Sequence, residues 1–163
     1  MERRLRRAQV EALYEQHSRG LRAYACSVTG SFAAAEDAVH LVFERLLHNG
    51  IEIAGPPTPY LYRAVHNAAL NHIRGKSREA ELTDIWLESP GGMEQSALEV
   101  QSALAELPQN QREVIILHIW AQMSFDEISS ALEISANTAA SRYRYGLSKL
   151  RAQFASEPSR RQP

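Results

Sequence analysis

The sequence predicts an all-α protein of two small helical domains joined by a flexible acidic linker, the second domain containing a helix-turn-helix. Apolar residues recur three and four positions apart through most of the 163 residues, and no run alternates strictly as a strand would. Glycine and proline interrupt the pattern at GPPTP (55–59) and SPGG (89–92). Residues 79–106 hold seven acids and no base, whereas the segments on either side are mildly basic. We therefore expect domains at 1–78 and 101–155, a linker at 79–100 and a tail at 156–163.

Composition indicates the cellular location of the protein. Apolar residues make up 44% of the sequence, enough for two cores, but no run approaches the roughly 20 residues of a membrane span. The arginine-containing N-terminus lacks the apolar segment of a secretory signal. The single Cys26 excludes an internal disulfide and is expected to pack as a small apolar residue. We expect a cytoplasmic protein with no membrane partner.

The first domain is expected to contain three main helices. The first spans roughly residues 5–29, and the second contains 35–47 and ends at an Asn-Gly pair. Thr58 is expected to cap the third helix, 59–74, which stops at Gly75. Each helix has an apolar stripe that can pack against the other two.

Polar side chains form candidate binding surfaces outside these apolar stripes on the second and third helices. Asp37, His40 and Glu44 share the outer side of 35–47, which by residue type alone indicates a solvated surface. The side chains of the third helix could form a platform for unstacked bases, since rings stack on bases and cations follow the strand. Alternatively, the tyrosines pack at the helix start and the cations are solvated. The residues concerned are Tyr60, Tyr62, Arg63, His66, Asn67 and Arg74.

The second domain shows clear helix starts. The segment after Pro108 is apolar nearly all round and should be central to its core. Ser124 and Glu127 have the spacing of a capping box, and Ser135 can cap the last helix. Glu133 stands in the turn between these helices, where glycine would adopt a left-handed conformation at lower cost.

The last helix, 136–152, concentrates positive charge. Residues 137–151 hold four cations and no acid, although the whole chain has a net charge of −1. A short helix, a tight turn and a longer basic helix are typical of a helix-turn-helix that enters the major groove. Small polar residues suit base edges and cations suit phosphates, whereas the alternative is a solvated basic face. The candidate DNA-binding residues are Asn137, Thr138, Ser141, Arg142, Arg144, Tyr145, Lys149 and Arg151.

No enzyme chemistry stands out. The six histidines are scattered, and His66 and His72 lie on different sides of a helix, so they do not form a metal pair. The sequence contains no glycine-rich phosphate loop and no evident nucleophile with its base. We therefore expect no catalytic activity, no metal and no cofactor.

Both halves together resemble a known family. The segments AEDAVHLVFERLL and PYLYRAVHNAALNHIR, an acidic linker, LPQNQREVIILHIW and SFDEISSALEISANTAASRYRYGLSKLR look like a sigma-70-type RNA polymerase sigma factor of the extracytoplasmic-function group. The resemblance covers roughly residues 10–152. The second half alone is also similar to LuxR-type regulators, so the order and spacing of the two halves carry the specificity.

The resemblance implies a transcription initiation factor that binds core RNA polymerase and directs it to promoter DNA. It implies that Asp37, His40 and Glu44 dock on the clamp helices of the β′ subunit, and that the β flap is a further point of contact on core polymerase. Helix 59–74 and the loop before it correspond to the reader and melter of the minus-ten element. Helix 136–152 corresponds to the minus-thirty-five reader. An anti-sigma factor is a further candidate partner.

The sequence departs from the family pattern at several positions. His40 and Leu41 replace a glutamine and an acid, Tyr60 a tryptophan, Asn71 an aspartate and Glu133 the usual turn glycine. Two other functions remain open. A stand-alone helix-turn-helix regulator would bind duplex DNA without polymerase, usually as a dimer. A sigma-mimic adaptor would bind only an anti-sigma protein, and the basic last helix argues against it.

Overall fold

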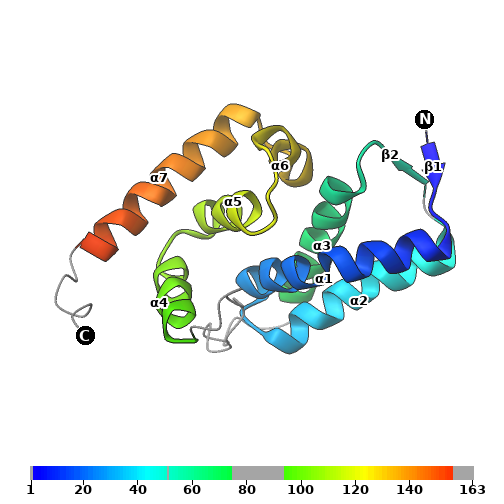
Figure 1. The fold of residues 1–163 in the computed structure, drawn as a ribbon, viewed down its shortest axis with the longest axis horizontal. Coiled ribbons are helices and arrows are strands. Elements are labelled where there is room, and N and C mark those ends of the chain that lie inside the picture. Colours follow the sequence, from blue (N-terminus) through cyan, green and yellow to red (C-terminus); the bar gives the residue numbers. More distant parts are fainter. Residues whose placement is uncertain (1, 51, 75–93, 156–163) are drawn as a thin grey trace.

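The computed structural model describes residues 2–50, 52–74 and 94–155, and most of that length is helical (Figure 1). One group of helices precedes residue 75 and another follows residue 93. The first group consists of α1 (Arg7–Thr29), α2 (Phe32–Asn49) and α3 (Pro57–Arg74). The second consists of α4 (Glu94–Ala105), α5 (Gln109–Ile119), α6 (Phe125–Leu132) and α7 (Ala136–Ala155). The predicted all-α class with two helical groups is confirmed.

The first three helices pack against one another around a common core. Leu21 of α1 and Leu61 and Val65 of α3 are completely buried there. Gly30 and Gly50 end α1 and α2 in the left-handed conformation, with φ of 74° and 54°. The expected end of the first helix near residue 29 and the Asn-Gly stop of the second are therefore confirmed, because glycine adopts this conformation without a Cβ clash.

The helix-turn-helix forms through the predicted caps. Ser124 and Glu127 make both hydrogen bonds of a capping box at the start of α6. The Ser135 hydroxyl accepts a hydrogen bond from the Thr138 backbone N–H at 3.0 Å and so caps α7. Glu133 ends α6 in the left-handed region, with φ of 56°. Four successive apolar residues of α5, residues 114–117, are at most 1% exposed, which confirms that α5 is central to its core.

Three features differ from the sequence expectations. A two-stranded antiparallel sheet pairs β1 (Glu2–Arg4) with β2 (Glu52–Ala54), a long-range pairing that short segments do not signal. Helix α3 begins at Pro57, which suits a first turn because proline has no N–H to leave unpaired. The Thr58 hydroxyl, the expected cap, instead lies 3.3 Å from His17 Nε2.

The predicted flexible linker needs a further correction. Helix α4 begins at Glu94, so residues 94–100 belong to a helix rather than to a linker. Residues 79–93, the tail at 156–163 and the Gly75 helix stop lie outside the described residues. Within the described part of the chain, no helix is both long and apolar enough to cross a membrane.

The two helical groups are in contact. Figure 1 shows α5 and α6 beside the first group, and the contacts join α1 to α5 and α3 to α6. Helix α7 packs on α5 and α6. The contact between the groups therefore runs along the helix that the sequence predicts to handle the minus-ten strand.

Candidate nucleic-acid and polymerase interfaces

Helix α7 presents a polar, cationic outer surface. Its buried side consists of Ala139, Gly146 and Leu150. Gly146 allows close packing there, because a Cβ at this position would lie 2.6 Å from Ile115 Cδ1 of α5 and would displace that side chain. On the outside, Tyr145 is 67% exposed. The other predicted DNA-binding residues that are exposed are Asn137, Arg144, Lys149 and Arg151.

Three predicted residues near the start of α7 are only half-exposed. The Thr138 side chain accepts a hydrogen bond from the Ser135 hydroxyl at 2.8 Å. The Ser141 hydroxyl accepts one from Arg144 Nη2 at 3.3 Å. Arg142 is also half-buried. Among the predicted residues in the first two turns of α7, Asn137 is therefore the fully exposed one.

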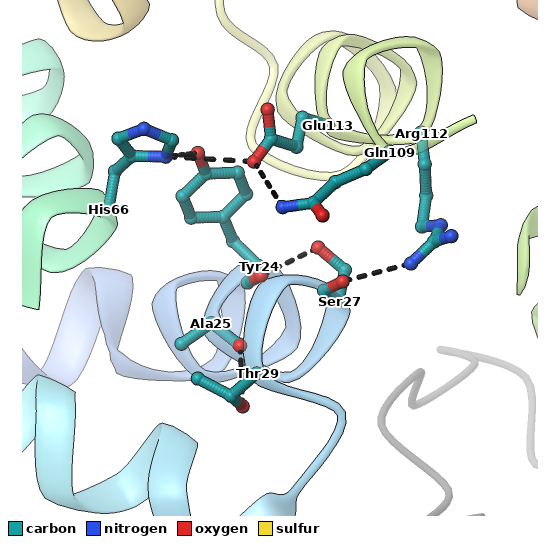
Figure 2. A network of polar contacts seen from close by, with 8 residues as sticks. All are labelled: Tyr24, Ala25, Ser27, Thr29, His66, Gln109, Arg112 and Glu113. Atoms are coloured by element: carbon teal, nitrogen blue, oxygen red, sulfur yellow. Dashed lines mark hydrogen bonds and ion pairs between the residues drawn. The ribbon is translucent and has the colours of Figure 1, made fainter. Parts of the chain in front are cut away.

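The predicted residues of α3 do not share one surface. Arg63, Asn67 and Arg74 are exposed, at a spacing that places them along one side of the helix. Tyr60 is half-buried against the core. His66 is half-buried too and points toward α5 (Figure 2).

Tyr62 corrects the sequence interpretation. The prediction placed this ring on the outer side of α3, but it is only 2% exposed. It packs edge to face with Tyr24, with ring centroids 5.7 Å apart, and its hydroxyl lies against Gly20. Burial raises the pKa of the Tyr62 hydroxyl well above its usual range. Tyr62 stands three residues before the buried Val65, a spacing that could have identified it as a core residue.

A buried polar network joins α1, α3 and α5. Of its members, the sequence indicates only His66, as a candidate for binding the minus-ten strand. Figure 2 shows Glu113 of α5 pointing toward His66 and Tyr24. The Tyr24 hydroxyl lies 2.7 Å from His66 Nδ1, and Glu113 Oε1 lies 3.6 Å from the same nitrogen. Gln109 Nε2 donates to Glu113 Oε1 at 3.4 Å. The only available signal was a charged pair, Arg112-Glu113, inside an otherwise apolar helix.

Burial sets the charge states in this network. It raises the pKa of the Glu113 carboxyl, against opposing effects from the Gln109 hydrogen bond, Arg112 and Arg142. It also lowers the pKa of His66, against an opposing effect from Glu133. Both shifts favour the uncharged forms, so His66 is mainly neutral near pH 7. The tautomer of His66 decides whether its Nδ1 donates or accepts the hydrogen bond with the Tyr24 hydroxyl.

We expect Glu113→Gln to raise the melting temperature at pH 8 and to have less effect, or the opposite effect, at pH 5. A raised folded-state pKa means that the folded protein binds more protons than the unfolded chain, so wild-type stability falls as pH rises through that pKa. The glutamine variant lacks this loss. Thermal melts of both proteins between pH 5 and pH 8 measure the difference. A constant difference across this range would show that the Glu113 carboxyl is not destabilised by burial.

Arg112 is the second buried charge of α5, with 9% exposure. Its guanidinium donates to four carbonyl oxygens at 2.9–3.2 Å. Leu104, Ala105 and Leu107 supply three of them at the end of α4, and Ser27 supplies the fourth in the last turn of α1. Arg112 therefore binds the C-terminal ends of two helices, where carbonyls are unpaired and the helix dipole favours a cation.

A third contact between the groups lies at the surface. The Arg63 guanidinium of α3 forms a hydrogen-bonded ion pair with the Glu133 carboxylate at the end of α6. The two side chains are 49% and 66% exposed, so the pair is partly solvated. This contact occupies one of the exposed cations that the sequence assigns to the minus-ten strand.

Helix α2 carries the predicted polymerase-binding residues on one side. Asp37, His40 and Glu44 are all exposed. His40 and Glu44 also line a groove of about 440 Å³ between α1 and α2. Its floor includes Tyr14 and Phe43, whose rings pack edge to face at 5.1 Å. An apolar groove with a charged rim is suited to a helical protein partner. Among the described residues, no three potential ligands converge as a metal site.

Two family descriptions match the chain in order. Residues 13–79 match "Sigma-70 region 2", and residues 97–150 match "Sigma-70, region 4". The curated relatives include the ECF RNA polymerase sigma factor SigM of Bacillus subtilis (strain 168). It is 22% identical over 135 residues, covering 77% of this chain and 83% of the relative.

Solved structures with a similar fold include two protein–protein complexes. The sigma factor RpoE, solved with the anti-sigma factor NepR from Bartonella quintana, aligns with a TM-score of 0.71 and 18% identity, over 90% of this chain and 97% of that one. CnrH, solved with the cytosolic domain of CnrY, aligns with a TM-score of 0.67 and 20% identity, over 93% of this chain and 91% of that one. These likenesses support the fold of both helical groups together.

Proposed function

Because the chain belongs to the sigma-70 family and to its extracytoplasmic-function group, we propose that α2, α3 and α7 are its working surfaces. The protein is a transcription initiation factor that directs core RNA polymerase to specific promoters. The observation that carries this function is the succession of region 2 and region 4 along one chain. A stand-alone helix-turn-helix regulator would need only the second match.

We assign the minus-thirty-five element to α7. Its exposed cations, Arg144, Lys149 and Arg151, suit phosphates on either side of a groove. Asn137 stands at the N-terminal end of the helix, where base edges come within reach. An amide side chain can make two hydrogen bonds to one adenine, so Asn137 supports sequence reading rather than charge attraction alone.

We assign the opened minus-ten strand to the exposed side of α3. Arg63, Asn67 and Arg74 suit the phosphates and base edges of a single strand, and the half-buried Tyr60 is the ring available for stacking. The buried Tyr62 supports these residues from the core. His66 reaches the strand only if α3 separates from α5.

We assign core polymerase to the α2 face and its groove, with the β′ clamp helices as the partner and the β flap as the partner of the second group. An anti-sigma factor is a further proposed partner, since the similar sigma factor RpoE was solved in complex with one. We also propose that 1–78 and 101–155 act as separate domains during initiation. Such a protein acts with polymerase in the cytoplasm and needs no catalytic group of its own.

The test of the function is reconstitution with core polymerase. Purified protein should bind core enzyme in a pull-down and support run-off transcription from promoters selected out of a genomic library. Core enzyme alone should not initiate at those promoters. Binding to duplex DNA without any association with polymerase would favour the stand-alone regulator instead.

We expect the double variant Asp37→Ala, Glu44→Ala to weaken core binding at least tenfold while leaving the melting temperature unchanged. Both side chains are exposed, so their loss should change the stability by no more than about 0.5 kcal/mol. Competition binding against a labelled sigma factor measures the affinity. Arg45→Ala, another exposed change on α2, is the control. Equal affinities for all three proteins would remove the α2 face from the polymerase interface.

We expect the exposed residues Lys149 and Asn137 of α7 to contribute to promoter binding in different ways. Lys149→Ala should weaken promoter binding for all sequences alike and reduce the salt dependence by about one ion. Asn137→Ala should cost about 1–3 kcal/mol at the preferred site and relax the preference at one position. Selection from a randomised upstream element, repeated with each variant, distinguishes them. If neither variant alters the selected sequence, α7 contributes only electrostatic attraction.

A further inference from the structure

The two DNA-facing helices are too close together to bind a promoter in this arrangement. By their names, the minus-ten and minus-thirty-five elements are about 25 base pairs apart, or roughly 85 Å of duplex at 3.4 Å per base pair. Here α3 contacts α6 directly, and α6 is joined to α7 by a short turn. Helix α7 itself is only about 30 Å long. The structure is therefore a closed state, and promoter binding requires the two groups to separate.

One residue in the closed contact has an unfavourable backbone conformation. Glu133 ends α6 with φ of 56° and ψ of 44°, a region that residues with a Cβ adopt at a cost and glycine adopts freely. The turn itself does not need a carboxylate, because its backbone N–H already bonds to the Ser129 carbonyl. What the side chain contributes is the ion pair with Arg63 across the contact.

We propose that Glu133 is a latch that holds the free protein closed, its carboxylate occupying the Arg63 guanidinium that a promoter phosphate would otherwise take. The assignment of Arg63 to DNA rests on the proposed function, but the latch itself does not. Because carboxylate and phosphate compete for one guanidinium, binding of the strand and opening of the latch favour each other.

Other contacts besides the Arg63–Glu133 pair also join the two helical groups in the closed state. The Arg112 bond to the Ser27 carbonyl at 2.9 Å and the approach of Glu113 to His66 also join the two groups. These contacts and the Arg63–Glu133 pair act on the same equilibrium between the closed and the open state. Of these contacts, only the Arg63–Glu133 pair lies on the exposed side of α3, where a strand can reach it.

A thiol-protection experiment on the full chain measures the opening directly. Ser27 is 2% exposed and lies beneath Arg112, so the labelling rate of Ser27→Cys in a Cys26→Ala background reports separation of the groups (Figure 2). Ala33→Cys in the same background is the exposed reference. The rate is compared with and without Glu133→Gly, a change that should also favour the left-handed turn and preserve folding.

We expect Glu133→Gly and Glu133→Gln to speed labelling at Ser27→Cys by about two- to fivefold, the range of a partly exposed ion pair. Arg63→Glu should act in the same direction, and combining it with Glu133→Arg should restore slow labelling. Asp126→Asn, which removes another exposed acid of α6, should change nothing. Unchanged labelling in both Glu133 variants, or labelling of the parent as fast as the reference, would overturn the proposal.

Binding of a single-stranded minus-ten oligonucleotide separates this proposal from the proposed function. If the latch and the DNA assignment both hold, Glu133→Gly should bind the strand about two- to fivefold more tightly, because more of the protein is open. Faster labelling with no strand binding by any variant supports the latch and removes α3 from the minus-ten role. Strand binding that is the same in parent and variant, together with unchanged labelling, leaves the function standing and rejects the latch.

Discussion

Replacing Arg112 by alanine is expected to lower the free energy of unfolding by about 3–5 kcal/mol, because it removes a buried charge that serves four acceptors. Three of these carbonyls lie at the end of α4 and would lose their shared donor. The fourth, on Ser27, belongs to α1, so its loss also weakens the contact between the helical groups. Chemical denaturation measured by circular dichroism provides the comparison.

Arg112→Lys is the informative second variant. A lysine keeps the charge near the ends of α1 and α4, but its single ammonium cannot reach four carbonyls in a planar arrangement. We therefore expect most of the loss to remain. Arg45→Ala, an exposed arginine of α2, should change the stability by no more than about 0.5 kcal/mol. If Arg112→Lys is as stable as wild type, attraction to the helix dipoles rather than the fork of hydrogen bonds accounts for the role of Arg112.

The parts of the fold that the sequence predicted are those set by local signals. Gly30 and Gly50 end helices because few other residues adopt their φ, and Ser124 starts one because its hydroxyl reaches a backbone N–H three residues on. The exposed cations of α7 were predicted from the same periodicity that identified its buried side. These signals act over a few residues and can be recognised without the rest of the chain.

The features that the sequence did not predict depend on residues far apart in the chain. Arg112 bonds to Ser27 across 85 positions, and Arg63 pairs with Glu133 across 70. No local pattern links these residues, so the closed contact and the latch were visible only in the structure. Glu133 was recognised as an unusual residue for its turn, but its partner could not be identified. The sheet between β1 and β2 has the same origin in long-range pairing.

Tyr62 shows that a helix can be predicted correctly while a side chain on it is assigned to the wrong side. Helical periodicity placed α3 correctly. A tyrosine beside the buried stripe, however, can either bury its ring in the core or point toward solvent, because it has an apolar ring and a polar hydroxyl. The ring of Tyr24, which comes from a different helix, decides the choice by packing against Tyr62. The sequence had left both interpretations open, and the interpretation in which this tyrosine packs is the one that the structure supports.

Tyr62→Ala is accordingly expected to destabilise the protein by about 3–5 kcal/mol, the usual loss for a large buried ring. It should abolish promoter opening because the first helical group unfolds, so this variant alone cannot test for stacking. Tyr62→Leu can, since leucine fills part of the core but offers no ring to a base. We expect Tyr62→Leu to remain folded below its lowered melting temperature and to open the minus-ten region normally in permanganate footprinting.

Compared with Tyr62→Leu, the matched variant Tyr60→Leu should lose less stability but more strand opening. Tyr60 is half-buried at the start of α3, so Tyr60→Leu should cost less stability than Tyr62→Leu. Loss of its stacking, worth about 1–3 kcal/mol per base, should nevertheless reduce strand opening by tenfold or more. Both variants are compared at a temperature where circular dichroism shows each to be folded. Normal opening with Tyr60→Leu and loss of opening with Tyr62→Leu would mean that the Tyr62 ring leaves the core when the closed state opens, and that it stacks on the strand after all.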